Sequence, residues 1–357
     1  MNTTKLKNVC VVVSGSTPKS TDKRYWNGTH VWITPAELSE DSFIVTDSER
    51  HITDEAIKAT GLKSFPKGTV LLSSRAPIGK VAIAGCEMYC NQGFKNLICS
   101  ESIYNLYLYY FLKSKTAYLN SLGRGATFKE ISKGIVEDIS IPFPVYSEQI
   151  RIAKQLQKIS ELISLKKGQY RYFDDIIRSR FLEMFGDIEL NSQNMQKMMW
   201  QEVFDTQTGK LDANAAVKGG RYPFFTCAKE ISTIDEYAYD CEALLLAGNN
   251  AVGDYDVKYY KGKFNAYQRT YILMLKNRQY SYSVFKFQLE QKLRYLQLQS
   301  KGTNTRYLTM GILRSLDFIV PPIVKQQEFA QFVNATDKSK YRGRIFLHLL
   351  EDVSYML

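Results

Sequence analysis

Apolar residues recur along this chain with two different periods. Over residues 1–145 and 195–322, short β-branched or apolar runs end at Gly, Pro or Asn, which is typical of strands. Helices are expected among them at 105–114 and 281–291. Each block is therefore predicted to be a mixed α+β globule with a twisted sheet. The expected strands are 9–13, 70–74, 81–84, 139–143, 243–247, 271–275 and 316–320.

Residues 146–194 and 323–357 contain a helical heptad pattern instead. In the first of these segments apolar side chains recur three, four or seven residues apart, between an expected N-cap at Ser147 and an expected stop at Gly186. The seam of the second segment is weaker. The predicted seam residues are Ile152, Leu156, Ile159, Ile163, Tyr170, Phe173, Ile177, Phe329, Val333, Leu347 and Leu350.

So narrow an apolar stripe on a long helix needs a partner. We therefore expect the two helical segments to pair with each other as a coiled coil. The alternative is that each helix packs only on its own globule. Thr336, Lys340 and Gly343 interrupt the second seam and weaken the expected pairing.

The chain also repeats itself. Residues 123–156 and 300–333 align at an offset of 177, and both contain a basic Gly turn, a helical step, a β run, a proline and the start of a helix. The matched pairs are Gly125 with Gly302, Gly134 with Gly311, Pro144 with Pro321 and Gln149 with Gln326. The two globules are therefore interpreted as diverged copies, in a pseudo-twofold arrangement.

The net charge of +11 favours a polyanionic partner. The excess lies on the two globules, at +4 for residues 1–145 and +5 for 195–322. No apolar run approaches the length of a membrane span and no signal peptide is recognised. The six cysteines are too few for a disulfide scaffold, so a reducing cytoplasm is expected. A zinc site at Cys86, Cys90 and Cys99 is disfavoured, because no histidine is near.

Catalytic motifs are not found. The chain contains no P-loop, no dinucleotide-binding glycine motif, no nucleophile elbow and no Asn/Asp-Pro-Pro-aromatic tetrapeptide of amino-methyltransferases. A metal-dependent endonuclease built on Asp240, Asp256 and Lys258 is one alternative function. A protein-interaction scaffold that does not bind DNA is another.

DNA-binding chemistry is better represented. Basic and hydroxyl side chains on tight turns suit phosphates, while Asn, Gln and Arg can pair with base edges. Such residues cluster at corresponding places in both copies. The candidate DNA-binding residues are Lys19, Arg24, Thr34, Arg75, Lys80, Asn91, Gln92, Lys95, Arg124, Thr127, Lys210, Asn249, Asn250, Tyr267, Gln268, Arg269, Lys301 and Asn304.

With these residues, the chain resembles the specificity subunit of type I restriction–modification systems. The segments that carry the resemblance include GTVLLSSRAPIGKVAIAG, NQGFKNL, EALLLAGNNAVGDY and NAYQRTYIL, and the repeated G-x8-G-I pattern. The resemblance implies target-recognition domains at 1–145 and 195–322. It implies that a spacer helix at 146–194 and its helical partner at 323–357 form an antiparallel coiled coil that separates these domains. It implies a non-catalytic subunit that reads a bipartite double-stranded DNA target.

The resemblance also implies a prokaryotic cytoplasm and partner subunits. These are two modification (N6-adenine methyltransferase) subunits and, in a full nuclease, two restriction subunits. No cofactor is expected on this chain itself. S-adenosylmethionine, ATP and Mg²⁺ are expected on the partner subunits.

Overall fold

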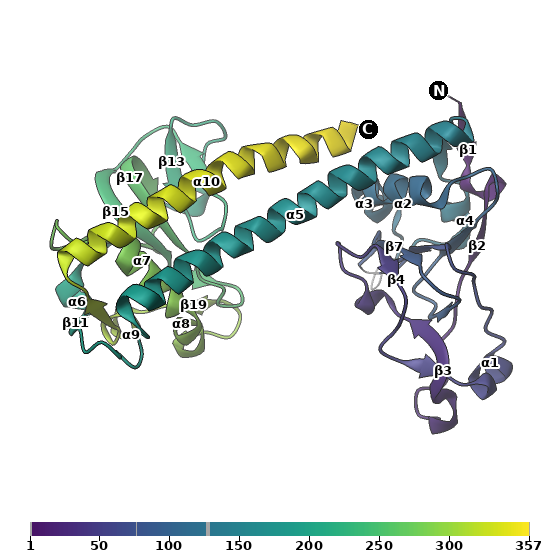
Figure 1. The fold of residues 1–357 in the computed structure, drawn as a ribbon, viewed down its shortest axis with the longest axis horizontal. Helices are drawn as coiled ribbons and strands as arrows, with labels where there is room; N and C mark the ends of the chain where they lie inside the picture. The colour runs from purple at the N-terminus through teal and green to yellow at the C-terminus, as the bar shows by residue number, and fades with distance from the viewer. Residues whose placement is uncertain (1, 76, 126–128, 357) are drawn as a thin grey trace. The chain divides into compact units, whose positions relative to one another are not determined.

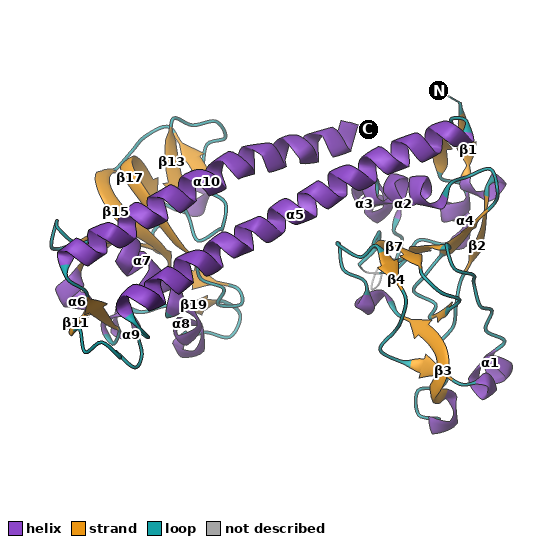
Figure 2. Cartoon of the chain, viewed as in Figure 1, coloured by secondary structure: helices purple, strands orange, loops and turns teal. Residues whose placement is uncertain are grey.

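The structure, a computed structural model, describes residues 2–75, 77–125 and 129–356, apart from the side chains of 341–349 and 351–356. It divides into two compact units, Met1–Leu165 with Leu347–Leu357, and Lys166–Phe346. Both units contain strands and helices (Figure 2), which confirms the predicted α+β class. Within the described part of the chain, no helix is both long and apolar enough to cross a membrane.

The first unit is built on a five-stranded sheet in the order β2-β9-β6-β7-β4. Every residue of β6 and β7 is buried, which explains why both read as continuous apolar runs in the sequence. A three-stranded sheet, β5-β3-β8, and the pair β1-β10 complete the unit. The strands are β1 (Thr3–Lys5), β2 (Cys10–Val13), β3 (Trp26–Ile33), β4 (Ile44–Val45), β5 (His51–Ile52), β6 (Val70–Leu72), β7 (Val81–Ala84), β8 (Tyr89–Cys90), β9 (Asn96–Cys99) and β10 (Ser140–Pro142).

Helix α2 covers this sheet through contacts with β6 and β7. It buries Leu106, Leu108 and Leu112 in the same core as Val70 and Leu97. The helices of the unit are α1 (Asp54–Thr60), α2 (Asn105–Ser114), α3 (Thr116–Leu122) and α4 (Lys133–Glu137), and its 3₁₀ turns are η1 (Leu6–Asn8), η2 (Lys23–Tyr25) and η3 (Pro35–Glu37).

The second unit is built on a six-stranded sheet in the order β12-β18-β15-β17-β13-β14. Its core is strongly aromatic, with Trp200, Phe204, Phe285 and Phe318 packed together. The strands are β11 (Gln196–Met199), β12 (Phe204–Thr208), β13 (Tyr222–Phe225), β14 (Ser232–Ile234), β15 (Tyr239–Ala247), β16 (Asn249–Asn250), β17 (Val257–Ala266), β18 (Thr270–Leu275), β19 (Arg306–Tyr307) and β20 (Asp317–Val320). The short helices are α6 (Trp200–Val203), η4 (Ala213–Ala215), α7 (Tyr282–Gln291), α8 (Leu293–Gln299) and α9 (Met310–Arg314).

The repeat seen in the sequence is a structural repeat. Helices α2, α3 and α4 correspond to α7, α8 and α9, and each pair begins 177 residues apart. Strand β10 pairs antiparallel with β1, as β20 pairs with β11. The long helices α5 (Tyr146–Phe185) and α10 (Ile323–Met356) then begin at the same offset. The prediction of two diverged copies is confirmed.

Helix α5 has 40 residues, close to the predicted extent. It ends as predicted, because Gly186 has a φ of 73° and donates its N–H to the Leu182 carbonyl at 2.8 Å. It begins at Tyr146, so Ser147 lies inside the first turn and the N-cap prediction at that residue is wrong.

The second unit contains the predicted helix pair. There α5 and α10 lie side by side (Figure 1), and Ile177, Phe181 and Phe329 share one apolar cluster. Arg180 donates to Glu328 at 2.5 Å. Lys340 pairs with Asp174, so rising numbers in one helix meet falling numbers in the other and the pair is antiparallel.

The other predicted seam residues do not all pack between α5 and α10. Val333 packs against the α5/α10 cluster. Ile152 and Leu156, however, join the core of the first unit, so the start of α5 packs on its own domain. Ile159, Ile163, Tyr170, Phe173 and Leu350 are half-buried, and the side chain of Leu347 lies outside the described residues.

Candidate nucleic-acid interface

In the second unit, four of the predicted DNA-binding residues line one pocket. The pocket has a volume of about 510 Å³. Thr305 and Tyr307 also line it, and the sequence reasoning missed both, although the neighbouring Lys301 and Asn304 pointed to the same loop. The lining residues are Asn249, Tyr267, Gln268, Arg269, Thr305 and Tyr307.

One wall of the pocket is a turn at residues 267–269, which we call the reading turn. Its backbone is held at both ends: Tyr267 donates its N–H to the Phe225 carbonyl at 2.9 Å, and the Arg269 carbonyl accepts from Gly248 at 2.8 Å. A Cβ on Gly248 would lie 2.3 Å from that carbonyl oxygen, so the close approach requires glycine. The Gln268 side chain donates to Asp212 at 2.6 Å.

Strand β16, paired with β19, also contributes to the lining. Asn249 lies across from Tyr307 in this two-stranded ladder. Asn250 has a structural role, because its side-chain oxygen accepts from the backbone N–H groups of Val252 and Asp254 at 2.9 and 3.1 Å. Lys301 and Tyr307 close the loop 301–307 through reciprocal backbone hydrogen bonds.

The first unit has the same backbone arrangement. Its reading turn is 91–93, where Asn91 donates its N–H to the Ile33 carbonyl at 3.1 Å and the Gly93 carbonyl accepts from Ser74 at 2.8 Å. The Gln92 side chain is again bonded, here by the Thr17 hydroxyl at 2.6 Å.

The loop of the first unit is closed in the same way. Arg124 and Glu130 form the reciprocal bridge, and Glu130 also lies opposite Arg75. The positions of Arg75 and Glu130 therefore correspond to those of Asn249 and Tyr307 in the second unit.

The side chains on this shared backbone differ between the units. Arg75 and Lys95 donate to the Glu130 carboxylate at 2.8 and 3.1 Å. Burial raises the pKa of Glu130, but the hydrogen bonds from Arg75 and Lys95 outweigh burial and hold the pKa below its usual range. Lys95 is only 7% exposed, so direct contact with DNA would require its internal pairing to break.

Other predicted residues of the first unit take part in local structure. The Lys80 ammonium donates to the carbonyls of Leu38 and Pro35. Thr34 donates its backbone N–H and its hydroxyl to Glu37 at 2.7 and 2.9 Å. The oxygen of the Asn91 side chain accepts from the Gly93 N–H at 2.9 Å.

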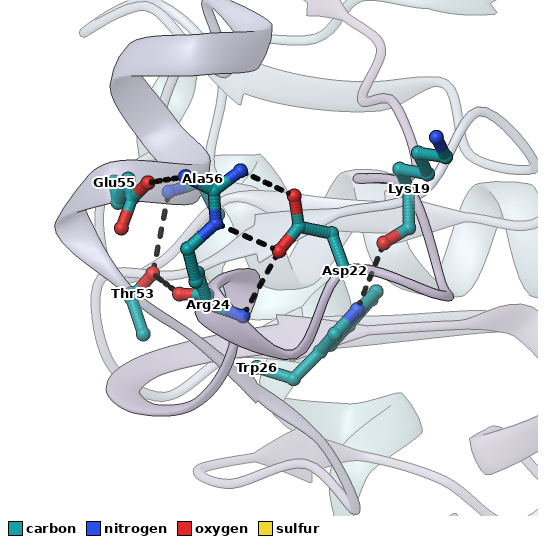
Figure 3. Close-up of polar contacts among 7 residues, drawn as sticks. All are labelled: Lys19, Asp22, Arg24, Trp26, Thr53, Glu55 and Ala56. Carbon is teal, nitrogen blue, oxygen red and sulfur yellow. Dashed lines mark hydrogen bonds and ion pairs between the residues drawn. The ribbon is translucent and has the colours of Figure 1, made fainter.

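Arg24 lies in η2, which contacts α1, and Lys19 precedes η2 along the chain. The Arg24 guanidinium donates to Asp22 at 2.7 and 3.0 Å and forms an ion pair with Glu55 at 3.2 Å. These interactions hold the pKa of Arg24 above its ordinary value, the hydrogen bonds to Asp22 contributing most. In Figure 3 the ammonium of Lys19 points away from this network, and the Lys19 carbonyl accepts from Trp26 at 3.3 Å.

Arg124, Lys210, Lys301 and Asn304 are exposed. Thr127 lies outside the described residues. Contact of each predicted residue with DNA stays a prediction.

The alternative endonuclease interpretation is wrong in its geometry. Asp240 pairs with Lys263 at one end of the β15–β17 ladder, whereas Asp256 adjoins the Leu246–Val257 pair at the other end. Six residues of β15 separate these points, about 20 Å at the rise of a strand. Of the three proposed residues, Asp256 and Lys258 form an ion pair with each other, while Asp240 lies away from both.

The cysteines that could have held zinc do not gather either. Cys90 accepts from the Asn96 side chain at 3.2 Å, and burial raises the pKa of its thiol to about 12. Among the residues that the structure describes, no group of three His, Cys, Asp or Glu side chains is arranged to hold a metal.

Known proteins share both the sequence pattern and the fold. The MjaIX specificity subunit of Methanocaldococcus jannaschii is 42% identical over 188 residues, 52% of this chain and 44% of that protein. The EcoprrI specificity subunit of Escherichia coli is 24% identical over 361 residues, which cover 93% of this chain and 86% of that protein. The first two curated relatives are matched over less than half of their length.

A solved structure, the type I restriction–modification S subunit from M. genitalium, has a similar fold with a TM-score of 0.60. It is 16% identical, and the alignment covers 99% of this chain and 93% of that one. The family model for the type I restriction modification DNA specificity domain matches residues 1–171 and 192–342. The chain therefore belongs to the type I restriction modification DNA specificity domain family.

Proposed function

We propose that this chain is the DNA-reading subunit of a type I restriction–modification complex. Residues 1–145 and 195–322 are its target-recognition domains, and the helical segments 146–194 and 323–357 separate them. Each domain reads one half of a bipartite double-stranded DNA target. The chain itself is not an enzyme: two methyltransferase subunits, with restriction subunits in the full nuclease, supply the reactions and bind S-adenosylmethionine, ATP and Mg²⁺.

One observation carries this proposal. The two units hold a reading turn and a closed loop by the same backbone hydrogen bonds, but the side chains at corresponding positions differ. The pair Arg75 and Glu130 of the first unit occupies the positions that correspond to Asn249 and Tyr307 in the second. A shared backbone with different polar side chains suits two modules that read different base sequences.

The two modules also share the charge that DNA binding needs. Both blocks are net positive, which supplies affinity that does not depend on sequence. Side chains around the reading turns then discriminate between bases, at about 1–3 kcal/mol for each good bidentate contact.

Exchange of one domain tests the proposal. Residues 1–145 are replaced by the corresponding block of another family member, the chain is expressed with its methyltransferase partner, and the methylated DNA is sequenced. We expect one half of the target to change and the other to remain. Replacement of 195–322 is the matched control and should change only the other half. A change in both halves from a single exchange contradicts modular reading.

The second readout is the salt dependence of DNA binding. The purified complex should bind its target more weakly as salt rises, because phosphate contacts release counterions. A complex that binds no DNA at any salt concentration contradicts the proposal and favours a protein-interaction scaffold.

A further inference from the structure

A buried glutamine lies in the first turn of each long helix. Gln149 is the fourth residue of α5, and none of its surface is exposed. Its side-chain oxygen accepts from the Tyr104 N–H at 2.9 Å. Its side-chain nitrogen donates to the carbonyls of Pro144 and Ser102, at 3.0 and 3.2 Å. The amide thus ties α5 both to the segment that precedes it and to the start of α2.

Gln326 repeats this arrangement in the second unit. It is the fourth residue of α10 and is equally buried. Its oxygen accepts from the Ser281 N–H at 2.9 Å, and its nitrogen donates to the Pro321 carbonyl at 2.7 Å. Tyr104 and Ser281 are the N-cap residues of α2 and α7, and neither caps its helix with its own side chain.

Packing alone does not require an amide at these positions. A buried apolar side chain of similar size would fill the same volume, but it would leave the N–H and carbonyl groups unsatisfied. Hydrogen bonds are directional, so an acceptor and a donor on one planar amide restrict the orientation of the helix more tightly than apolar contact does. In both copies this set of hydrogen bonds, which we call the joint, connects the same three positions: the glutamine, the N-cap residue of α2 or α7, and the proline before the long helix.

Helix length amplifies any change at the joint. Helix α5 has 40 residues, about 60 Å at 1.5 Å per residue. A tilt of about 5° at its first turn would displace the far end of such a rod by about 5 Å, more than the rise of one base pair, about 3.4 Å.

We propose that Gln149 and Gln326 are positioning residues that set the direction in which each long helix leaves its domain. Through that direction they determine the gap between the two halves of the DNA target. This inference rests on the proposed function, since it presupposes a bipartite target.

The test replaces each glutamine by methionine, which has a similar shape but lacks the amide. Gln288→Met is the matched control. Gln288 is also fully buried and makes two backbone hydrogen bonds, with the N–H and carbonyl of Ile319 at 2.9 and 3.0 Å, but it lies on α7 within one domain. All variants are studied as the complex with the methyltransferase subunits.

The readout is methylation of duplexes in which the two halves are constant and the gap varies by one base pair. We expect Gln149→Met and Gln326→Met to reduce the preference for the native gap by roughly tenfold or more, since misplacement of a few ångströms is costly. Gln288→Met should lower thermal stability and leave the gap preference unchanged. Equal gap preference in the joint variants and the control would overturn the proposal.

Two further outcomes are separable. If Gln149→Met does not fold, Gln149→Asn is measured instead, because it keeps the amide but shortens its reach, and it should also relax the gap preference. If the unmodified complex itself shows no dependence on the gap, the proposed bipartite reading fails, and not only the role of the glutamines.

Discussion

Lys301 and Tyr307 exchange two backbone hydrogen bonds, of 3.1 and 2.8 Å, and close a loop beside the pocket of the second unit. Arg124 and Glu130 form the same bridge 177 residues earlier, at 3.0 and 2.9 Å. The backbone is thus conserved within the chain, while an aromatic side chain replaces a carboxylate. Differences in DNA sequence preference between the two units should follow from such exchanges.

Arg269 should contribute to DNA affinity in the second unit. It lines the pocket, so Arg269→Ala should weaken binding to all sequences and lower the slope of log affinity against log salt by about one if it meets a phosphate. Titration of labelled duplex at several salt concentrations measures this. Arg278→Ala is the control, because Arg278 is exposed after the other end of β18. Equal losses in both variants would contradict a specific role for Arg269.

Asn249 should affect specificity more than stability. Asn249 lines the pocket, so Asn249→Ala should relax the base preference in the half of the methylated target that the second unit reads. The half that the first unit reads should remain unchanged. The neighbouring substitution Asn250→Ala should instead cost about 1 kcal/mol of unfolding free energy, because it removes the side-chain oxygen that accepts from the N–H groups of Val252 and Asp254. Methylation sequencing and thermal melts separate the two effects. If Asn249→Ala relaxed the base preference in the half read by the first unit, the assignment of Asn249 to the other half would be contradicted.

Glu130 should make stability dependent on pH in the acidic range. Its pKa in the folded protein is lowered, so its contribution to stability is complete above the unfolded-state pKa, about 4.3, and is lost as pH falls through the lower folded value. Glu130→Gln should cost about 1–3 kcal/mol at neutral pH, because the buried Lys95 loses its partner. The difference in melting temperature between the two proteins should shrink towards pH 3, and a constant difference would argue against the ion pair.

Phe181 should be essential for packing of the helix pair in the second unit. It is fully buried and stacks on Phe287 with ring centroids 4.2 Å apart. Phe181→Ala should destabilise this unit by about 3–5 kcal/mol, through lost burial and the resulting cavity. Leu182→Ala on the next residue, 43% exposed, should change stability by less than about 0.5 kcal/mol. Denaturant unfolding of the full chain measures both.

Local patterns located most elements of the fold. The runs at 81–84 and 271–275 form β7 and most of β18, and the predicted helix at 105–114 is α2. The heptad spacing located α5, and the matched glycines and prolines located the repeat. These features could be predicted because they depend on neighbouring residues: periodicity, turn formers and helix stops.

Contacts between residues far apart in the chain could not be predicted from such local patterns. Glu130 and Tyr307 were missed because they reach Arg75 and Asn249 only through bridges that join residues 55 and 58 positions apart. The heptad pattern likewise left two alternatives open for Ile152 and Leu156, contact with the second long helix or with their own globule, and the structure shows that they pack on the core of the first unit.

Patterns along the chain were enough to predict the duplicated α+β architecture, the two long helices and the basic character of both copies. The folded structure was needed to show which side chains share a pocket, which cations are already paired inside the protein, and that Asp240 and Asp256 lie apart. This division arises because hydrophobic period and turn chemistry are encoded locally, whereas strand register and burial depend on packing of the whole unit.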